Sequence, residues 1–188
     1  MIVNVVELIT LDGIVSDPDG SQGTPLGGWR FRYGRKEVGT EDRLRLGPAL
    51  DEGVLLLGRV TRQLFARIGP GRQDPRAARM CAAAKLVASR TLTDADASAW
   101  ADSKVLDDDL VDAVRRERRD VLVHGSLRIA DRPRTADLVD EYRLLTFPTV
   151  PGTGRRLFPA HGRPADLELL DVAHVGPVVL TRYGRAAR

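Results

Sequence analysis

The residues best suited to chemistry in this sequence are small and basic ones at the ends of predicted strands. Gly58, Arg59 and Thr61 follow the fully apolar run 54–57 and open a helical pattern. The first turn of a helix has free backbone N–H groups and partial positive charge, so it binds anions. Glycine lets the backbone approach a ligand closely, and a guanidinium group suits a phosphate. The motif predicts a phosphate site, although a tight turn and a capped helix explain it equally well.

Two further strand ends repeat this pattern of hydroxyl, basic and glycine residues. They consist of Ser89, Arg90, Thr91, His124, Gly125 and Ser126. Taken singly, each group is also explained by helix capping and a solvated strand end. Sheets in α/β proteins bind ligands outside the carboxyl ends of their strands. We therefore expect all three groups to contact one long ligand that carries several phosphates.

The elements that must position these residues alternate between strand and helix patterns. Strands are predicted at 2–11, 54–57, 85–89, 121–124, 141–150, 167–172 and 178–183. Helices are predicted at 36–50, 60–66, 75–83 and 107–118, with a short helix from Ser126 that Pro133 interrupts. Pro48 is expected to end or kink the first helix, and 91–102 is expected to be irregular. The order predicts one α/β domain over residues 1–188, with a mixed, mostly parallel sheet, helices on both faces and a final antiparallel hairpin.

Composition excludes several classes of protein. With 188 residues and 43% hydrophobic content the chain can bury a core without disulfides or metals, and its one cysteine cannot form an intramolecular disulfide or a cysteine zinc site. No apolar run approaches the length of a membrane span, and no leader precedes the first strand, so we expect a cytoplasmic protein without a membrane or metal partner. The basic segment 115–119 contains Glu117 and is better explained as a solvated helix end than as a nucleic-acid site.

Several motifs in their order resemble a known family. They are Thr10-Leu11-Asp12-Gly13, Gly27-Gly28-Trp29, Leu55-Leu56-Leu57-Gly58-Arg59-Val60-Thr61, Val87-Ala88-Ser89-Arg90-Thr91-Leu92, Val123-His124-Gly125-Ser126, Leu138-Val139-Asp140-Glu141-Tyr142-Arg143-Leu144 and Phe147-Pro148-Thr149-Val150-Pro151-Gly152-Thr153-Gly154-Arg155-Arg156-Leu157-Phe158. Over nearly its whole length the chain resembles the dihydrofolate-reductase-like reductases, in particular the C-terminal reductase domain of the riboflavin-biosynthesis deaminase-reductase. The resemblance implies a dihydrofolate-reductase-like three-layer fold with NADPH as the hydride donor.

The resemblance also implies roles for the three strand-end groups. Gly58, Arg59 and Thr61 would contact the pyrophosphate and the adenosine 2′-phosphate, Ser89 and Arg90 would line the adenosine end, and the turn at Gly125 and Ser126 would close over the pyrophosphate. The full predicted cofactor set is Gly58, Arg59, Val60, Thr61, Ser89, Arg90, Thr91, His124, Gly125, Ser126 and Leu127. Two arginines near one another favour a 2′-phosphate, and therefore NADP over NAD.

The substrate side of the site is less specific. Asp12 is the first candidate for a catalytic proton donor, with the acids Glu37, Glu41 and Asp42 as alternatives, although an Asp-Gly turn explains Asp12 too. The loop 16–35 is predicted to be a functional lid. Its aromatic residues and a later phenylalanine are candidates for stacking on a flat heterocycle, and core packing explains them equally well; they are Trp29, Phe31, Tyr33 and Phe158.

The sequence therefore predicts an NADPH-dependent reductase of a small heterocyclic or ribosylaminopyrimidine-type substrate. Two alternatives stay open, which are an NADPH-binding module without turnover and a dihydrofolate reductase proper. Because relatives often pair, a homodimer through Phe147 and Pro148 or through the final hairpin is also expected.

Overall fold

The computed structural model describes residues 1–33, 44–72, 74–98, 100–160 and 164–186. These residues form an eight-stranded sheet with the strand order β4-β3-β2-β5-β1-β6-β8-β7. The chain divides into two compact units, of which one contains Met1–Val5 and Arg45–Asp140 and the other Val6–Leu44 and Glu141–Arg188. Strand β1 (Val3–Thr10) contributes to both. Among the described residues, no helix has both the length and the apolar character needed to cross a bilayer.

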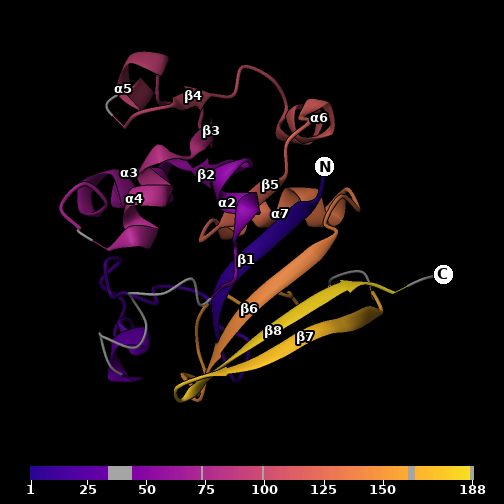
Figure 1. Ribbon diagram of the computed structural model, residues 1–188. Coiled ribbons are helices and arrows are strands. Elements are labelled where there is room, and N and C mark those ends of the chain that lie inside the picture. The colour runs from indigo at the N-terminus through magenta and orange to yellow at the C-terminus, as the bar shows by residue number, and fades with distance from the viewer. Residues whose placement is uncertain (34–43, 73, 99, 161–163, 187–188) are drawn as a thin grey trace. The chain divides into compact units, whose positions relative to one another are not determined.

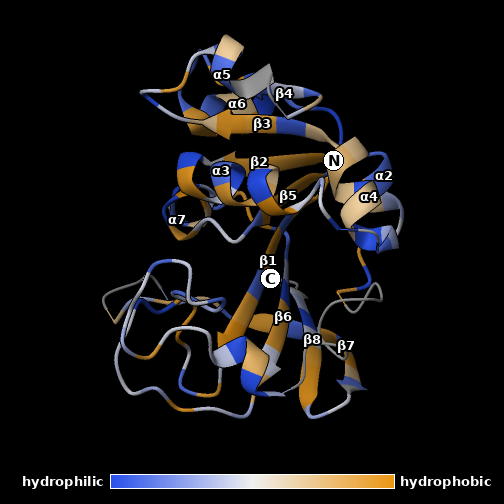
Figure 2. Ribbon diagram, turned by 90° about the vertical axis from the view of Figure 1, so that its left-hand side faces the viewer, coloured by the Kyte–Doolittle hydropathy of each residue, from blue (hydrophilic) through white to orange (hydrophobic). Residues whose placement is uncertain are grey.

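The first unit is an α/β layer around short parallel strands. Its strands are β2 (Val54–Gly58), β3 (Ala84–Ala88), β4 (Ser103–Val105) and β5 (Val121–His124). Strand β2 pairs in parallel with both β3 and β5, and β3 pairs with β4. The carboxyl ends of β2, β3 and β5 therefore meet at one edge of the sheet. Figure 2 shows that β2 and β3 are mostly apolar along their length, as expected for strands covered by helices.

Six helices of the described chain belong to this unit. They are α2 (Pro48–Asp51), α3 (Arg59–Ile68), α4 (Pro75–Ala82), α5 (Asp94–Ser98), α6 (Leu110–Arg116) and α7 (Leu127–Thr135) (Figure 1). Local capping explains where several begin. The Asp74 carboxylate accepts a hydrogen bond from Ala77 N ahead of α4, and Asp109 accepts one from Val111 N ahead of α6.

The second unit is built on an antiparallel hairpin. Strand β8 (Val178–Arg185) pairs with β6 (Glu141–Phe147) on one side and with β7 (Leu167–Val175) on the other, all antiparallel (Figure 1). The short 3-10 helix η1 (Trp29–Tyr33) packs beside β6, because the Trp29 ring lies edge-on against Phe147 at 5.2 Å between centroids. Together with the first unit, this architecture confirms the predicted α/β class, the mixed, mostly parallel sheet and the C-terminal antiparallel hairpin.

A buried ionic cluster fixes the hairpin to β6. The Glu141 carboxylate accepts hydrogen bonds from Arg143 Nε at 2.6 Å and Arg182 Nε at 2.7 Å. Burial alone would raise the pKa of Glu141, but the two guanidinium groups hold it below its ordinary value. The carboxylate therefore stays charged and paired, which gives Glu141 a structural role.

Some predicted elements were wrong, and the reasons are local. The segment 91–102 is not wholly irregular, because Thr93 and Asp96 exchange hydrogen bonds as a capping box and start α5. Pro48 begins α2 instead of ending a helix, since proline suits the first helical turn. Pro133 lies inside α7, where its side chain is buried. The short strand β4 was not predicted, and most of the helix predicted at 36–50 lies outside the described residues.

Candidate functional site

The end of β2 is joined directly to the end of β5. Gly58 N donates a hydrogen bond of 2.9 Å to Ser126 Oγ. A Cβ atom at position 58 would lie 3.2 Å from Ile129 Cγ1, so the Ile129 side chain would have to move by a few tenths of an ångström. Gly58 has φ −81°, so packing against α7, and not an unusual backbone conformation, explains the glycine. The group that lies close to Gly58 is therefore helix α7 of this chain.

A second hydrogen bond connects the same two strand ends, and here the hydroxyl group belongs to the β2–α3 side. Thr61 Oγ1, in the first turn of α3, donates to Gly125 O at 2.8 Å. Gly125 has φ +62°, a left-handed conformation that glycine adopts without strain. Each junction therefore contributes one hydroxyl group that satisfies the backbone of the other. We call this pair of contacts the reciprocal lock.

The reciprocal lock holds the N-termini of α3 and α7 next to one another. Neither helix has a side chain that caps its first turn, so both keep free backbone donors there. The Ser126 hydroxyl accepts from Gly58, so its own hydrogen is not used in that bond, and the residue is 6% exposed. The Thr61 hydrogen is already used within the lock. Two adjacent helix starts without side-chain caps are a candidate anion site.

Basic side chains flank this anion site. Arg59 is exposed at the start of α3, and its neighbour Val60 is 58% exposed. Gly58 is paired in register with Ala88, so the residues that follow β2 and β3 leave the sheet at the same edge. The Ser89 hydroxyl accepts hydrogen bonds from the backbone of Thr91 and Leu92, forming a turn that leaves Arg90 exposed. The described structure thus brings the three predicted groups together at one edge.

His124 has a packing role at this edge. Its side chain is 7% exposed, and its ring lies 5.5 Å from that of Phe65. The Arg76 guanidinium lies 3.1 Å from His124 Nε2. Because arginine only donates, Nε2 accepts and the ring proton is on Nδ1. Leu127, the last residue predicted to bind the cofactor, begins α7.

In the second unit, Asp12 is held in a turn after β1. Its carboxylate accepts hydrogen bonds from Thr10 Oγ1 and from Gly152 N. Partial burial by itself raises the pKa of Asp12, but these hydrogen bonds and the nearby Arg156 cation hold it below its ordinary value. Asp12 is therefore ionised at neutral pH, which suits an acceptor better than a proton donor. The alternative donors Glu37, Glu41 and Asp42 lie outside the described residues.

The four predicted stacking residues differ in exposure. Trp29 is 1% exposed, packs on Phe147 and donates from Nε1 to Ser16 O, so its ring belongs to the core. Tyr33 also lies near Phe147, at 6.0 Å between ring centroids. Phe31 and Phe158 are 37% and 45% exposed, but the Arg30 guanidinium lies 4.5 Å from the centre of the Phe31 ring, and the Tyr142 ring lies 5.3 Å from that of Phe158.

One buried acid of this unit, Glu7, was not singled out in the sequence analysis. Glu7 lies on β1, is 4% exposed, and its Oε1 has no hydrogen-bond partner among the described residues. Burial raises the pKa of Glu7 to about 8. The available signal was a single acid between the apolar pairs Val5-Val6 and Leu8-Ile9 of the first strand.

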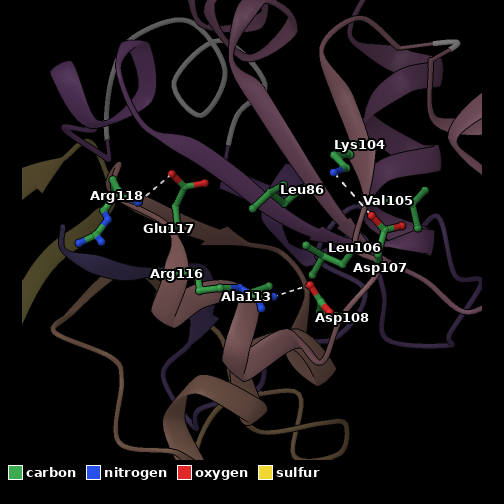
Figure 3. Close-up of a pocket in the computed structure, with 10 residues that line it drawn as sticks. All are labelled: Leu86, Lys104, Val105, Leu106, Asp107, Asp108, Ala113, Arg116, Glu117 and Arg118. Carbon is green, nitrogen blue, oxygen red and sulfur yellow. Dashed lines mark hydrogen bonds and ion pairs between the residues drawn. The ribbon is translucent and has the colours of Figure 1, made fainter.

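A separate pocket of about 250 Å³, lined by none of the predicted site residues, lies between β3, β4 and α6 (Figure 3). Three basic and three acidic side chains line it. Lys104 lies 3.6 Å from Asp107 and Arg116 bonds Asp108, whereas Glu117 accepts from the backbone N of Arg118 and pairs with the Arg119 side chain. Because these charges neutralise one another, the pocket offers no surplus charge to a phosphate ligand.

Comparison with known proteins places this chain in a family. Residues 2–181 match the family model of the RibD C-terminal domain, and the chain therefore belongs to that family. It is one of the riboflavin-biosynthesis, reductase-like domains. A search of curated protein sequences gave no match.

Two solved structures share the fold. One is a protein from Shewanella sp. PV-4 described provisionally as a riboflavin biosynthesis protein, with a TM-score of 0.75, 18% identity and complete coverage of both chains. The other is RibD from Acinetobacter baumannii, with a TM-score of 0.57 and 15% identity over 99% of this chain and 58% of that one. At these identities the two structures support the fold alone.

Proposed function

We propose that this protein is an NADPH-dependent reductase that acts on a small heterocyclic or ribosylaminopyrimidine-type substrate, with 5-amino-6-(5-phosphoribosylamino)uracil as the first candidate. The observation that carries the proposal is the pair of uncapped helix starts joined by the reciprocal lock, with Arg59 and Arg90 at the same sheet edge. Membership of the RibD C-terminal domain family supports a role in riboflavin biosynthesis.

The residues at this edge fit a dinucleotide that carries an additional phosphate. The backbone donors at the starts of α3 and α7, with the Ser126 hydroxyl, would bind the pyrophosphate. Arg59 and Arg90 would bind the 2′-phosphate, since exposed guanidinium groups pair well with a dianionic monoester. Bound NADPH would supply a hydride, and the protein would orient the cofactor and provide a proton.

The lowered pKa of Asp12 favours one alternative, an NADPH-binding module without turnover, because an ionised carboxylate is a poor proton donor. The two functions share the anion site and differ in whether the protein supplies a proton. Measurements of binding and of turnover therefore separate them.

The first test is calorimetric titration with NADPH and, separately, NADH. We expect micromolar binding of NADPH and much weaker binding of NADH. Arg59→Ala should weaken NADPH binding by about 1.5–3 kcal/mol, or roughly 10- to 150-fold, and affect NADH much less. Arg67→Ala is the matched control, because Arg67 is exposed in the last turn of the same helix.

The outcomes are distinct. No binding of either cofactor would contradict the reductase proposal, and equal losses for both cofactors in Arg59→Ala would show that Arg59 does not contact the 2′-phosphate. If NADPH binds, oxidation of NADPH is followed with 5-amino-6-(5-phosphoribosylamino)uracil and then with dihydrofolate. Binding with no oxidation by either substrate would favour the module without turnover.

A further inference from the structure

A row of three aromatic rings lies next to the reciprocal lock in the first unit. Phe65 lies in α3, and its ring contacts those of Trp100 and His124 at 6.4 Å and 5.5 Å between centroids. The Trp100 ring meets Phe65 edge-on, with 82° between the planes, which is a favourable geometry for an aromatic pair. Trp100 and His124 are 4% and 7% exposed, so the rings on both sides of Phe65 are buried. We call Trp100, Phe65 and His124 the aromatic row.

The aromatic row ends at the Gly125 turn of the reciprocal lock. A Cβ atom at position 125 would lie 3.9 Å from Phe65 Cζ and 3.4 Å from Thr61 Cγ2, so both side chains pack against this turn. Thr61 and Phe65 are four residues apart in α3 and therefore lie on one face of that helix. Thr61 also donates a hydrogen bond to Gly125 O, whereas Phe65, which has no polar group, contributes packing. Phe65 thus supports the turn from the α3 side.

The other end of the aromatic row is fixed by a buried cation. Lys85 is 1% exposed, and its Nζ lies 4.5 Å from the centre of the Trp100 ring. The ammonium group donates hydrogen bonds to three backbone carbonyls, those of Cys81, Ala83 and Ala101. These bonds restrict its movement, and its charge attracts the face of the indole ring. The Trp100 ring is therefore held in place, which keeps Phe65 against the Gly125 turn.

We propose that Phe65 is a positioning residue of the anion site, and that it holds the Gly125 turn in the conformation that presents backbone donors to the pyrophosphate of the cofactor. This inference rests on the proposed function and adds to it a residue that acts through its neighbour. Gly125 has φ +62°, and glycine has more backbone freedom than any other residue. A packed ring removes part of this freedom before the ligand arrives, so less free energy is lost on binding.

The effect of Phe65 should be confined to one part of the cofactor. Arg59 and Arg90, which we propose bind the 2′-phosphate, are exposed and do not belong to the aromatic row. Removing the Phe65 ring should therefore weaken ligands that carry a pyrophosphate and leave a ligand with only a 2′-phosphate unchanged. A residue that merely stabilised the fold would not distinguish the two kinds of ligand.

The test compares Phe65→Leu with the wild type by calorimetric titration with NADPH, with ADP and with adenosine 2′-monophosphate, which has no pyrophosphate. We expect Phe65→Leu to weaken binding of NADPH and ADP about 3- to 30-fold and binding of adenosine 2′-monophosphate less than about 2-fold. Val114→Ala is the matched control, because Val114 is 1% exposed in α6 and lies outside the aromatic row. It should lower stability and leave all three affinities unchanged. Wild-type affinity for ADP in Phe65→Leu, or an equal loss in Val114→Ala, would overturn the inference.

A second readout needs no ligand. Amide hydrogen exchange at Gly125, measured by NMR spectroscopy, should be faster in Phe65→Leu than in the wild type or in Val114→Ala. Trp100→Phe, which shortens the aromatic row away from the turn, should produce a smaller change of the same kind, and it replaces Phe65→Leu if that variant does not fold. Unchanged exchange in both variants would overturn the inference. If the wild type binds neither NADPH nor ADP, the proposed function fails and the inference fails with it, whereas wild-type binding without an effect of Phe65 removes the inference alone.

Discussion

Replacing Glu7 by glutamine should stabilise the protein, and by an amount that depends on pH. Glutamine has nearly the same shape and does not titrate. In the wild type the folded state favours the protonated form of Glu7, while the unfolded chain ionises at its ordinary pKa of 4.5. The folded state therefore binds more protons than the unfolded state between pH 4.5 and about 8, so the wild type loses stability as pH rises through this window. Below the window this difference vanishes, and above it the difference is constant.

The magnitude follows from the two pKa values. With about 8 in the folded and 4.5 in the unfolded state, ionisation of Glu7 on unfolding favours the unfolded chain by about 3 kcal/mol at pH 7 and about 1 kcal/mol at pH 5. Glu7→Gln removes this term. The free energy of unfolding of the variant, minus that of the wild type, should therefore increase by roughly 2 kcal/mol from pH 5 to pH 7. Other titrating groups are the same in both proteins and cancel.

The assay is urea unfolding followed by circular dichroism at pH 5, 6, 7 and 8, with Glu52→Gln as the exposed control. The stability of Glu7→Gln should change less with pH than that of the wild type, and the control should follow the wild type. A difference that stays constant within about 0.5 kcal/mol over this range would refute the reasoning. It would mean that Glu7 is ionised and solvated in the folded protein.

Three further predictions test other contacts. Thr61→Val removes the hydrogen bond to Gly125 O and should lower stability by about 1 kcal/mol and weaken NADPH binding, as measured by unfolding and calorimetry; an unchanged affinity would show that the lock does not shape the site. Lys85→Met removes three hydrogen bonds from a buried ammonium group to backbone carbonyls and should lower the free energy of unfolding by about 2–4 kcal/mol. If the variant is as stable as the wild type, the buried charge contributes no net stability. We propose a homodimer through β7, because this strand lies at the edge of the sheet and its residues Leu169 and Val172 are 54% and 56% exposed. Analytical ultracentrifugation should show a dimer for the wild type and a monomer for the variant in which both residues are lysine. A monomeric wild type would contradict the proposal.

The sequence predicted most of the strands because their signal is local. The apolar run 121–123 followed by His124 predicted β5 with its observed ends, and the turn residues around 176 predicted the final hairpin. Helix ends were less accurate where one polar contact decides them. The capping box of Thr93 and Asp96 could have been read from the sequence, but the helix that it begins is only five residues long and has no repeating apolar face.

The candidate site could be predicted in part, and the missing part is tertiary. The types of Gly58, Thr61 and Ser126 suggested ligand contacts, whereas the structure uses their polar groups first to join two distant strand ends. No pattern within one segment shows which remote backbone group a hydroxyl will bind. The same limit applies to Glu7 and Lys85, because their burial depends on elements that pack over them and not on their own neighbours in the chain.

The reciprocal lock has a consequence for ligand fragments. Gly58, Thr61, Gly125 and Ser126 are held in place by the fold before any ligand arrives, so binding of phosphate there requires little ordering of the chain. Affinity is lost mainly when flexible groups must be immobilised, and a rigid site avoids that loss. A compound that carries only the adenosine and its phosphates, such as adenosine 2′,5′-bisphosphate, should therefore retain a large share of the binding free energy of the whole cofactor. Such a fragment would serve as an inhibitor, and its attachment to a resin would give an affinity matrix for this protein.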